Sequence, residues 1–195
     1  MDTGLRITRL RRLPVDTFAN RPLSVGVGAG GTDDDGFPCH KTLVFDFPSL
    51  LEAHKRGIIP HLTGGYCLNT VVISELLLHE MDMANKKALH TLETEKSSEA
   101  VAHSNRVRDL LAFIYQNRRE EWLTFQRKGC EEDNGFLSEF NLKENLNDQR
   151  RYISCAAFLR DGRGSAVMLV TSVGRLQECA EMQGIPTVSV SSFRS

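Results

Sequence analysis

The apolar and polar residues of this chain alternate in a way that first predicts a buried strand. The run Thr42–Phe45 reads TLVF and is followed by a single carboxylate, Asp46. A strand with almost only apolar side chains is typical of a parallel sheet that is covered on both faces. A helix is expected over Ser49–Lys55, because Pro48 suits the first turn of a helix.

A second apolar run repeats this arrangement. Cys67–Ile73 reads CLNTVVI, is rich in β-branched residues and predicts another strand. Ser74 can cap the helix that follows, expected over Glu75–Leu89. Glu75 falls in the first turn of that helix, where the helix dipole favours a carboxylate. Two carboxylates are therefore expected at strand ends, where ligands bind in open α/β sheets.

Both carboxylates also have a purely structural interpretation. Asp46 can cap the helix after it, and Glu75 can simply compensate the dipole of its own helix. The local pattern leaves these roles open beside a functional one.

The rest of the chain continues the alternation of strands and helices. Glu93–Glu99 is polar and predicts a loop. A helix is expected over Ala100–Gln116, and Trp122 and Phe125 extend its apolar face. The segment Phe136–Leu146 is ambiguous. The later elements are expected as a buried helix over Asp148–Leu159 capped by Asn147, a strand over Ala166–Thr171, a helix over Leu176–Gln183 and a strand over Thr187–Val190. This order predicts a three-layer α/β/α domain with a central, mainly parallel sheet.

Residues 1–40 do not show this alternation. Arginines are interspersed with apolar residues over 1–13, as in a mitochondrial presequence, but Asp2 and the shortage of serine favour a basic surface segment. Ser24–Gly36 is glycine-rich and then acidic, which is typical of a linker. We expect residues 1–40 to be flexible or bound to a partner, and residues 41–195 to form the domain.

Charge, cysteine content and apolar runs make some classes of function less favoured than others. The formal net charge is −1, so no global basic field attracts nucleic acid, and any RNA contact must use a local patch. The five cysteines form no CxxC pair, which favours an intracellular, reducing compartment (cytoplasm, nucleus or mitochondrion) and no structural zinc. No apolar run approaches the length of a membrane span, so no membrane partner is expected.

Four features that occur in order resemble a PIN domain, the fold of many metal-dependent ribonucleases. They are the apolar strand ending at Asp46, the strand followed by Ser74, Glu75 and Leu76, a polar turn opening a helix at Asn147–Asp148, and VTS followed by a helix and GIPTVSV. The resemblance covers about Lys41–Ser195, and the long insertion before Asn147 is similar to the eukaryotic branch that includes the nonsense-mediated-decay endonuclease.

The resemblance implies a metal site made of carboxylates at strand ends. Asp46 matches the first acid and Glu75 the second, while Asp148 is the candidate for the third. Such carboxylates hold Mg²⁺ or Mn²⁺, because hard divalent cations take oxygen ligands. The metal then activates water and stabilises charge on the phosphate.

This sequence departs from the family pattern at several of these positions. The usual Asp-Thr-Asn has become Asp46-Phe47-Pro48, Asp148 lies one or two residues too early, and Val173 stands where a fourth acid is expected. Two arginines follow Asp148, and Arg150 or Arg151 can hold a phosphate without cutting it.

Three hypotheses follow. The favoured one is a degenerate PIN-like domain that binds or scaffolds RNA or a ribonucleoprotein complex, with Arg150 and Arg151 as RNA contacts and little or no nuclease activity. The second is an active single-strand endoribonuclease that uses Asp46, Glu75 and Asp148 with Mg²⁺ or Mn²⁺. The third is a protein-interaction module that docks on a catalytic partner, which the near-neutral charge makes credible.

Overall fold

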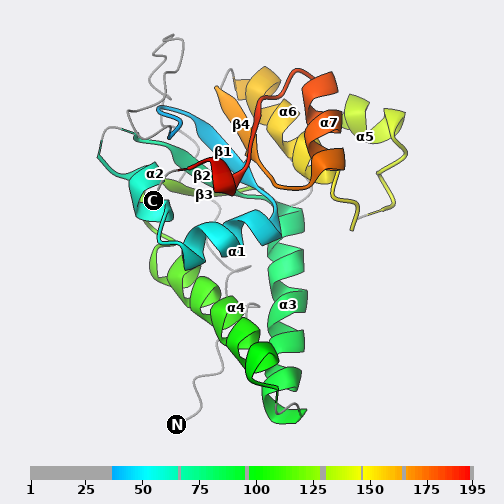
Figure 1. Cartoon of the computed structure of the whole chain (residues 1–195). Coiled ribbons are helices and arrows are strands. Elements are labelled where there is room, and N and C mark those ends of the chain that lie inside the picture. Colours follow the sequence, from blue (N-terminus) through cyan, green and yellow to red (C-terminus); the bar gives the residue numbers. More distant parts are fainter. Residues whose placement is uncertain are drawn as a thin grey trace.

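The computed structural model describes residues 37–65, 67–94, 97–127, 131–145, 147–163 and 166–193. Its centre is a five-stranded sheet in the order β3-β2-β1-β4-β5, in which all neighbouring strands are parallel (Figure 1). The strands are β1 (Thr42–Phe45), β2 (Thr70–Ile73), β3 (Leu123–Phe125), β4 (Val167–Val170) and β5 (Thr187–Val188). The predicted three-layer α/β/α domain with a central parallel sheet is confirmed.

Helices cover both faces of this sheet. In order they are α1 (Phe47–Lys55), α2 (Ile59–Thr63), α3 (Glu75–Thr94), α4 (Ser98–Gln116), α5 (Asn134–Glu139), α6 (Arg151–Arg163), α7 (Gly174–Met182) and the 3-10 helix η3 (Val190–Ser192). Helix α6 packs on β1 and β4, while α1 packs with α3 and α4 (Figure 1). In the described ranges no helix is long and apolar enough to cross a membrane.

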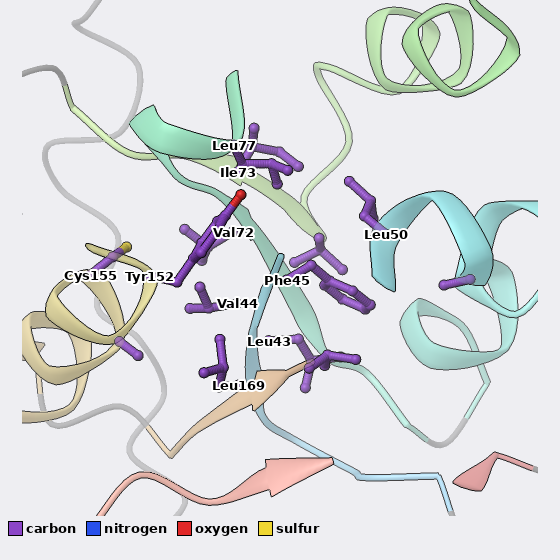
Figure 2. Packing of buried hydrophobic residues seen from close by; sticks show 14 of the residues in the cluster. Leu43, Val44, Phe45, Leu50, Val72, Ile73, Leu77, Tyr152, Cys155 and Leu169 are labelled. Carbon is purple, nitrogen blue, oxygen red and sulfur yellow. The ribbon is translucent and has the colours of Figure 1, made fainter. Parts of the chain in front are cut away.

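The core forms where alternate side chains of the central strands meet helices on each face. Figure 2 shows Tyr152 and Cys155 of α6 on the same side of the sheet as Val44, and Leu50 of α1 on the side of Phe45. This alternation follows from the two-residue period of a strand. All five side chains are buried in one continuous hydrophobic cluster.

Helices α3 and α4 form a hairpin that extends away from the sheet (Figure 1). They have 20 and 19 residues, which corresponds to about 30 Å of helix each. The predicted loop over Glu93–Glu99 is therefore shorter, because α3 runs to Thr94 and α4 begins at Ser98.

The prediction that Trp122 and Phe125 extend a helix is wrong. Helix α4 ends at Gln116, and Leu123–Phe125 forms β3, whose first residue pairs with Val71 of β2. A three-residue strand is too short to show its own period, so only pairing with β2 identifies it. Both aromatic side chains still pack against the core.

Two other predicted elements begin three residues later than expected. The strand predicted over Cys67–Ile73 begins only at Thr70, since Leu68 has a φ of 45° and cannot continue a strand. The helix predicted over Asp148–Leu159 begins at Arg151.

The two ends of the described chain lie together. Phe37 is buried and stacks on Phe193, with ring centroids 5.2 Å apart. The Arg56 guanidinium at the end of α1 donates to the carbonyl oxygens of Val190 (2.6 Å) and Phe193 (2.8 Å). Residues 37–40 thus pack on the domain, whereas the rest of the segment predicted to be flexible or partner-bound, 1–36, lies outside the described residues.

Candidate functional site

A polar residue follows the carboxyl end of every strand. These residues are Asp46, Ser74, Gln126, Thr171 and Ser189 after β1, β2, β3, β4 and β5, respectively. Because the strands are parallel, all five lie at one edge of the sheet. The chain places β2 and β3 on one side of β1 and β4 and β5 on the other. The point between β1 and β4 is where such folds usually bind ligands.

Asp46 lies at this switch point and is completely buried. Its Oδ1 accepts the Ser49 backbone N–H at 2.8 Å and so caps α1. Its Oδ2 accepts a short hydrogen bond from the Thr171 hydroxyl, which follows β4. The polar groups of the two strands that flank the switch point are thus bonded to each other, and the cap role that the sequence left open for Asp46 is present.

Glu75 begins α3 at the end of β2. The predicted cap by Ser74 is confirmed, since Ser74 Oγ accepts the Leu77 backbone N–H at 3.1 Å. The Glu75 backbone N–H donates to Gln126 Oε1 at 2.8 Å, and this bond links the segments that follow the carboxyl ends of β2 and β3. The Glu75 side chain is half-buried and interacts electrostatically with Glu132.

Arg151 and Glu132 form a largely buried ion pair beside Glu75. The Arg151 guanidinium donates to Glu132 at 2.7 Å and to the Leu142 carbonyl oxygen at 3.0 Å. Burial raises the pKa of Glu132, the positive charge of Arg151 opposes this rise, and the Glu75 carboxylate adds to it. Arg151, which the sequence suggested as an RNA contact, instead has its guanidinium engaged within the protein: only 8% of its side chain is exposed.

Asp148 and Arg150 form a second ion pair at the turn before α6. Arg150 donates from Nε to Oδ1 (3.0 Å) and from Nη2 to Oδ2 (2.6 Å) of Asp148, whose Oδ1 also accepts the Arg150 backbone N–H (2.9 Å). The side-chain hydrogen bond from Arg150 lowers the pKa of Asp148. Since both arginines near the start of α6 have acidic partners, the unfavourable sign of their charge at a helix N-terminus is compensated.

Arg150 is the exposed arginine of the predicted pair, and Arg175 joins it. The Arg150 side chain is 40% exposed. Arg175, an exposed residue in the first turn of α7, interacts electrostatically with both Asp148 and Cys179. Arg150 acts on Cys179 as well, so the positive charges of both arginines are felt at this thiol. No local sequence pattern joins Arg175 to Arg150.

A partly buried Tyr152–Glu80 pair is a further feature that the sequence did not reveal. The Tyr152 hydroxyl on α6 donates to Glu80 on α3 at 2.7 Å. Burial raises the pKa of Glu80, the hydrogen bond from Tyr152 opposes the rise, and the Asp46 carboxylate adds to it. Burial and the Glu80 charge together raise the pKa of Tyr152 far above its ordinary value. The residues are 72 positions apart, so no local pattern links them.

The donor set at this edge does not fit a Mg²⁺ or Mn²⁺ ion held by Asp46, Glu75 and Asp148. Among the described residues no group of three or more His, Cys, Asp or Glu is placed to hold a metal ion. Asp46 is inaccessible to solvent with both oxygens already accepting hydrogen bonds, and Asp148 already forms a two-point pair with Arg150. The acids instead act on each other by electrostatic repulsion: Asp46 raises the pKa of Glu80, and Glu75 raises the pKa of Glu132.

A cavity of about 420 Å³ lies away from this edge, between α3 and α4. Small residues, among them Ala84, Ala88, Ala100 and Ser104, contribute to its lining. None of the residues predicted for the site borders it, so it is a separate feature of the hairpin.

Comparison with known proteins assigns no family to this chain: no protein-family model matches it, and no curated protein sequence matches it significantly.

Proposed function

We propose that this chain is a degenerate PIN-like domain protein that acts by binding or scaffolding RNA or ribonucleoprotein components, with little or no nuclease activity. Its partners are then RNA, proteins of the same complex, or both, in an intracellular compartment. Mg²⁺ or Mn²⁺ is bound weakly if at all. The proposal rests on the sequence resemblance and on how the carboxylates are used.

The observation that carries the proposal is that both carboxylate oxygens of Asp46 already accept hydrogen bonds within the protein. In an active PIN site the first acid must be accessible to a cation. Here the side chain in that position is buried, caps α1 and accepts the Thr171 hydroxyl. Val173, at the position of a fourth acid, offers no oxygen ligand from its side chain. A metal would supply water activation and charge stabilisation, effects worth several kcal/mol in the barrier.

Arg150 and Arg175 support the binding part of the proposal. Guanidinium groups form two-point hydrogen bonds with phosphate oxygens. Both arginines act electrostatically on the single carboxylate Asp148, on a chain whose net charge is −1. A phosphate that replaces Asp148 as a partner of Arg150 is the contact that we expect for RNA.

Cleavage of a uridine-rich single-stranded RNA in the presence of Mn²⁺ tests the catalytic part. We expect no cleavage above background. Asp46→Asn is the control variant, because asparagine caps helices about as well as aspartate and preserves this part of the fold. If the wild-type protein cuts the RNA and a normally folded Asp46→Asn variant does not, the site is active and the proposal is wrong.

RNA affinity at several salt concentrations tests the binding part. Arg150→Gln/Arg175→Gln should weaken binding and reduce the dependence of log K on log salt by about 0.7 per lost phosphate contact. Arg108→Gln/Arg119→Gln, two exposed arginines on α4 and in the turn after it, removes the same charge and should have a smaller effect. Equal effects would indicate unspecific attraction. No effect of either change, together with a stoichiometric protein partner, would favour the protein-interaction module.

A further inference from the structure

Two cysteines far apart in the sequence place their thiols side by side. Cys39 Sγ lies 3.7 Å from Cys67 Sγ, and the residues are 28 positions apart. Cys39 is half-buried and Cys67 is buried just before β2. Neither cysteine is in a disulfide bond in this structure. Their spacing is not that of a CxxC motif, so only the fold reveals the pair.

The backbone around both cysteines holds the thiols in this position. The His40 backbone N–H donates to the Cys67 carbonyl oxygen at 2.6 Å. The Asn69 side chain bonds the same two segments, donating from Nδ2 to the Pro38 carbonyl oxygen (2.5 Å) and accepting the Lys41 backbone N–H (2.8 Å). Hydrogen bonds on both sides of the thiols therefore fix the approach of the two segments.

The residue after each cysteine has an unusual backbone conformation. His40 has a φ of 54° and Leu68 a φ of 45°, both in the left-handed region that residues other than glycine seldom adopt. Such conformations persist where the surrounding structure enforces them, and they are concentrated at functional sites. Here they turn the chain immediately after Cys39 and after Cys67, on both sides of the thiol contact.

We propose that Cys39 and Cys67 are a dithiol site that a hydroperoxide oxidises to an intramolecular disulfide. The Cys39 thiolate attacks a peroxide oxygen, and the O–O bond breaks. With hydrogen peroxide this gives the Cys39 sulfenic acid and hydroxide, which takes a proton and leaves as water. The Cys67 thiolate then attacks the Cys39 sulfur and displaces a second hydroxide, which leaves as water with the proton from Cys67. Two thiols and one peroxide thus yield one disulfide and two waters.

Geometry and exposure assign the two roles. Cys39 is the more exposed thiol, which suits the first attack on a solvent-borne oxidant, and the buried Cys67 resolves the sulfenic acid. The sulfurs must approach by roughly 1.7 Å to reach a disulfide bond length. The product ties the segment that leads out of residues 1–36 to the turn before β2. In a reducing compartment this link is reversible.

Peptide mapping of the reduced full-length chain after treatment with hydrogen peroxide tests this site. We expect a monomeric product that has lost two hydrogen atoms, with a peptide pair linked through Cys39 and Cys67, reversed by dithiothreitol. Its melting temperature should rise, because the link constrains the unfolded chain. Mapping the wild-type chain does not depend on any variant.

Two matched variants sharpen the test. Cys39→Ser should abolish the linked product. Cys179→Ser changes the other cysteine that is half-buried within the described part of the chain, and it should leave the rate of formation of this product unchanged. A different disulfide, a covalent dimer, or oxidation of Cys39 beyond the sulfenic acid in place of the linked product would overturn the proposal. Complete resistance of both thiols at peroxide concentrations that oxidise Cys179 would overturn it equally.

Discussion

The buried serine hydroxyls near the carboxyl ends of the strands differ in whether they form hydrogen bonds. Ser74 Oγ caps α3 by accepting the Leu77 backbone N–H. Ser49, one turn into α1, is equally buried, but its hydroxyl has no hydrogen-bond partner among the described residues. Its backbone N–H donates to Asp46 Oδ1. The two serines therefore allow the same substitution to be compared in opposite situations.

Ser49→Ala should leave the free energy of unfolding unchanged or raise it by up to about 1 kcal/mol, because it removes a buried hydroxyl that gains nothing on folding. Ser74→Ala should lower it by about 1 kcal/mol, the usual loss for a serine N-cap. Urea unfolding of both variants measures the difference. A loss of stability in Ser49→Ala as large as that in Ser74→Ala would show that the Ser49 hydroxyl has a partner, such as an ordered water.

Helices α3 and α6 are joined across the sheet edge by the Tyr152–Glu80 hydrogen bond. Tyr152→Phe removes the one interaction at Glu80 that lowers its pKa most, so the pKa of Glu80 should rise further above its ordinary value. The variant should also lose on the order of 1 kcal/mol of stability at neutral pH, because a half-buried carboxylate loses its donor. Carboxyl NMR titration and urea unfolding measure the two effects.

The pH dependence of this loss has a defined sign. The folded state binds the Glu80 proton more tightly than the unfolded chain, so the stability contributed by protonation is fully present below the unfolded pKa. It is lost as the pH rises through the folded pKa. Since Tyr152→Phe widens the gap between these pKa values, the variant should lose more stability relative to wild type at pH 7 than at pH 4. A difference that is constant across this range would contradict the assignment of Glu80.

The elements that the sequence predicted well are those with a strong local signal. Strands β1 and β4 are apolar runs, and the period of α3 and α4 is sustained over many residues, so their existence follows from local pattern. Strand β3 has three residues and exists only through pairing with β2. The sequence positions of Asp46 and Glu75 predicted that polar side chains lie at the carboxyl ends of the strands. They did not predict which groups these side chains contact.

Those contacts depend on long-range geometry. The partners of Asp46 and Arg151, Thr171 and Glu132 respectively, lie 125 and 19 positions away, and nothing in the local sequence pairs them. The resemblance to a PIN domain pointed to these positions as ligands, whereas their roles as ligand or cap depend on which groups the fold brings within hydrogen-bond distance.

At the scale of the whole molecule, β1 is the centre of the sheet. It has a strand on each side, and its side chains from Leu43 to Phe45 are fully buried. The edge strands β3 and β5 have three and two residues and are partly exposed. The seam between β1 and β4 also contains the Asp46–Thr171 bond, so access to Asp46 requires this seam to open.

Native-state hydrogen exchange tests whether the seam opens. Amides that pair β1 with β4 should exchange only through global unfolding, which costs about 5–15 kcal/mol in ordinary domains. Amides at β3 and β5 should exchange at least about tenfold faster, a difference of about 1.4 kcal/mol, because an edge strand can separate while the centre stays folded. The dependence of each rate on low concentrations of denaturant separates the two modes, since only global opening follows the full surface exposed on unfolding. If β1 amides instead exchange by a local opening that is insensitive to denaturant, Asp46 becomes accessible in the folded state. A cation could then reach its carboxylate, and the case against an active metal site would lose its main support.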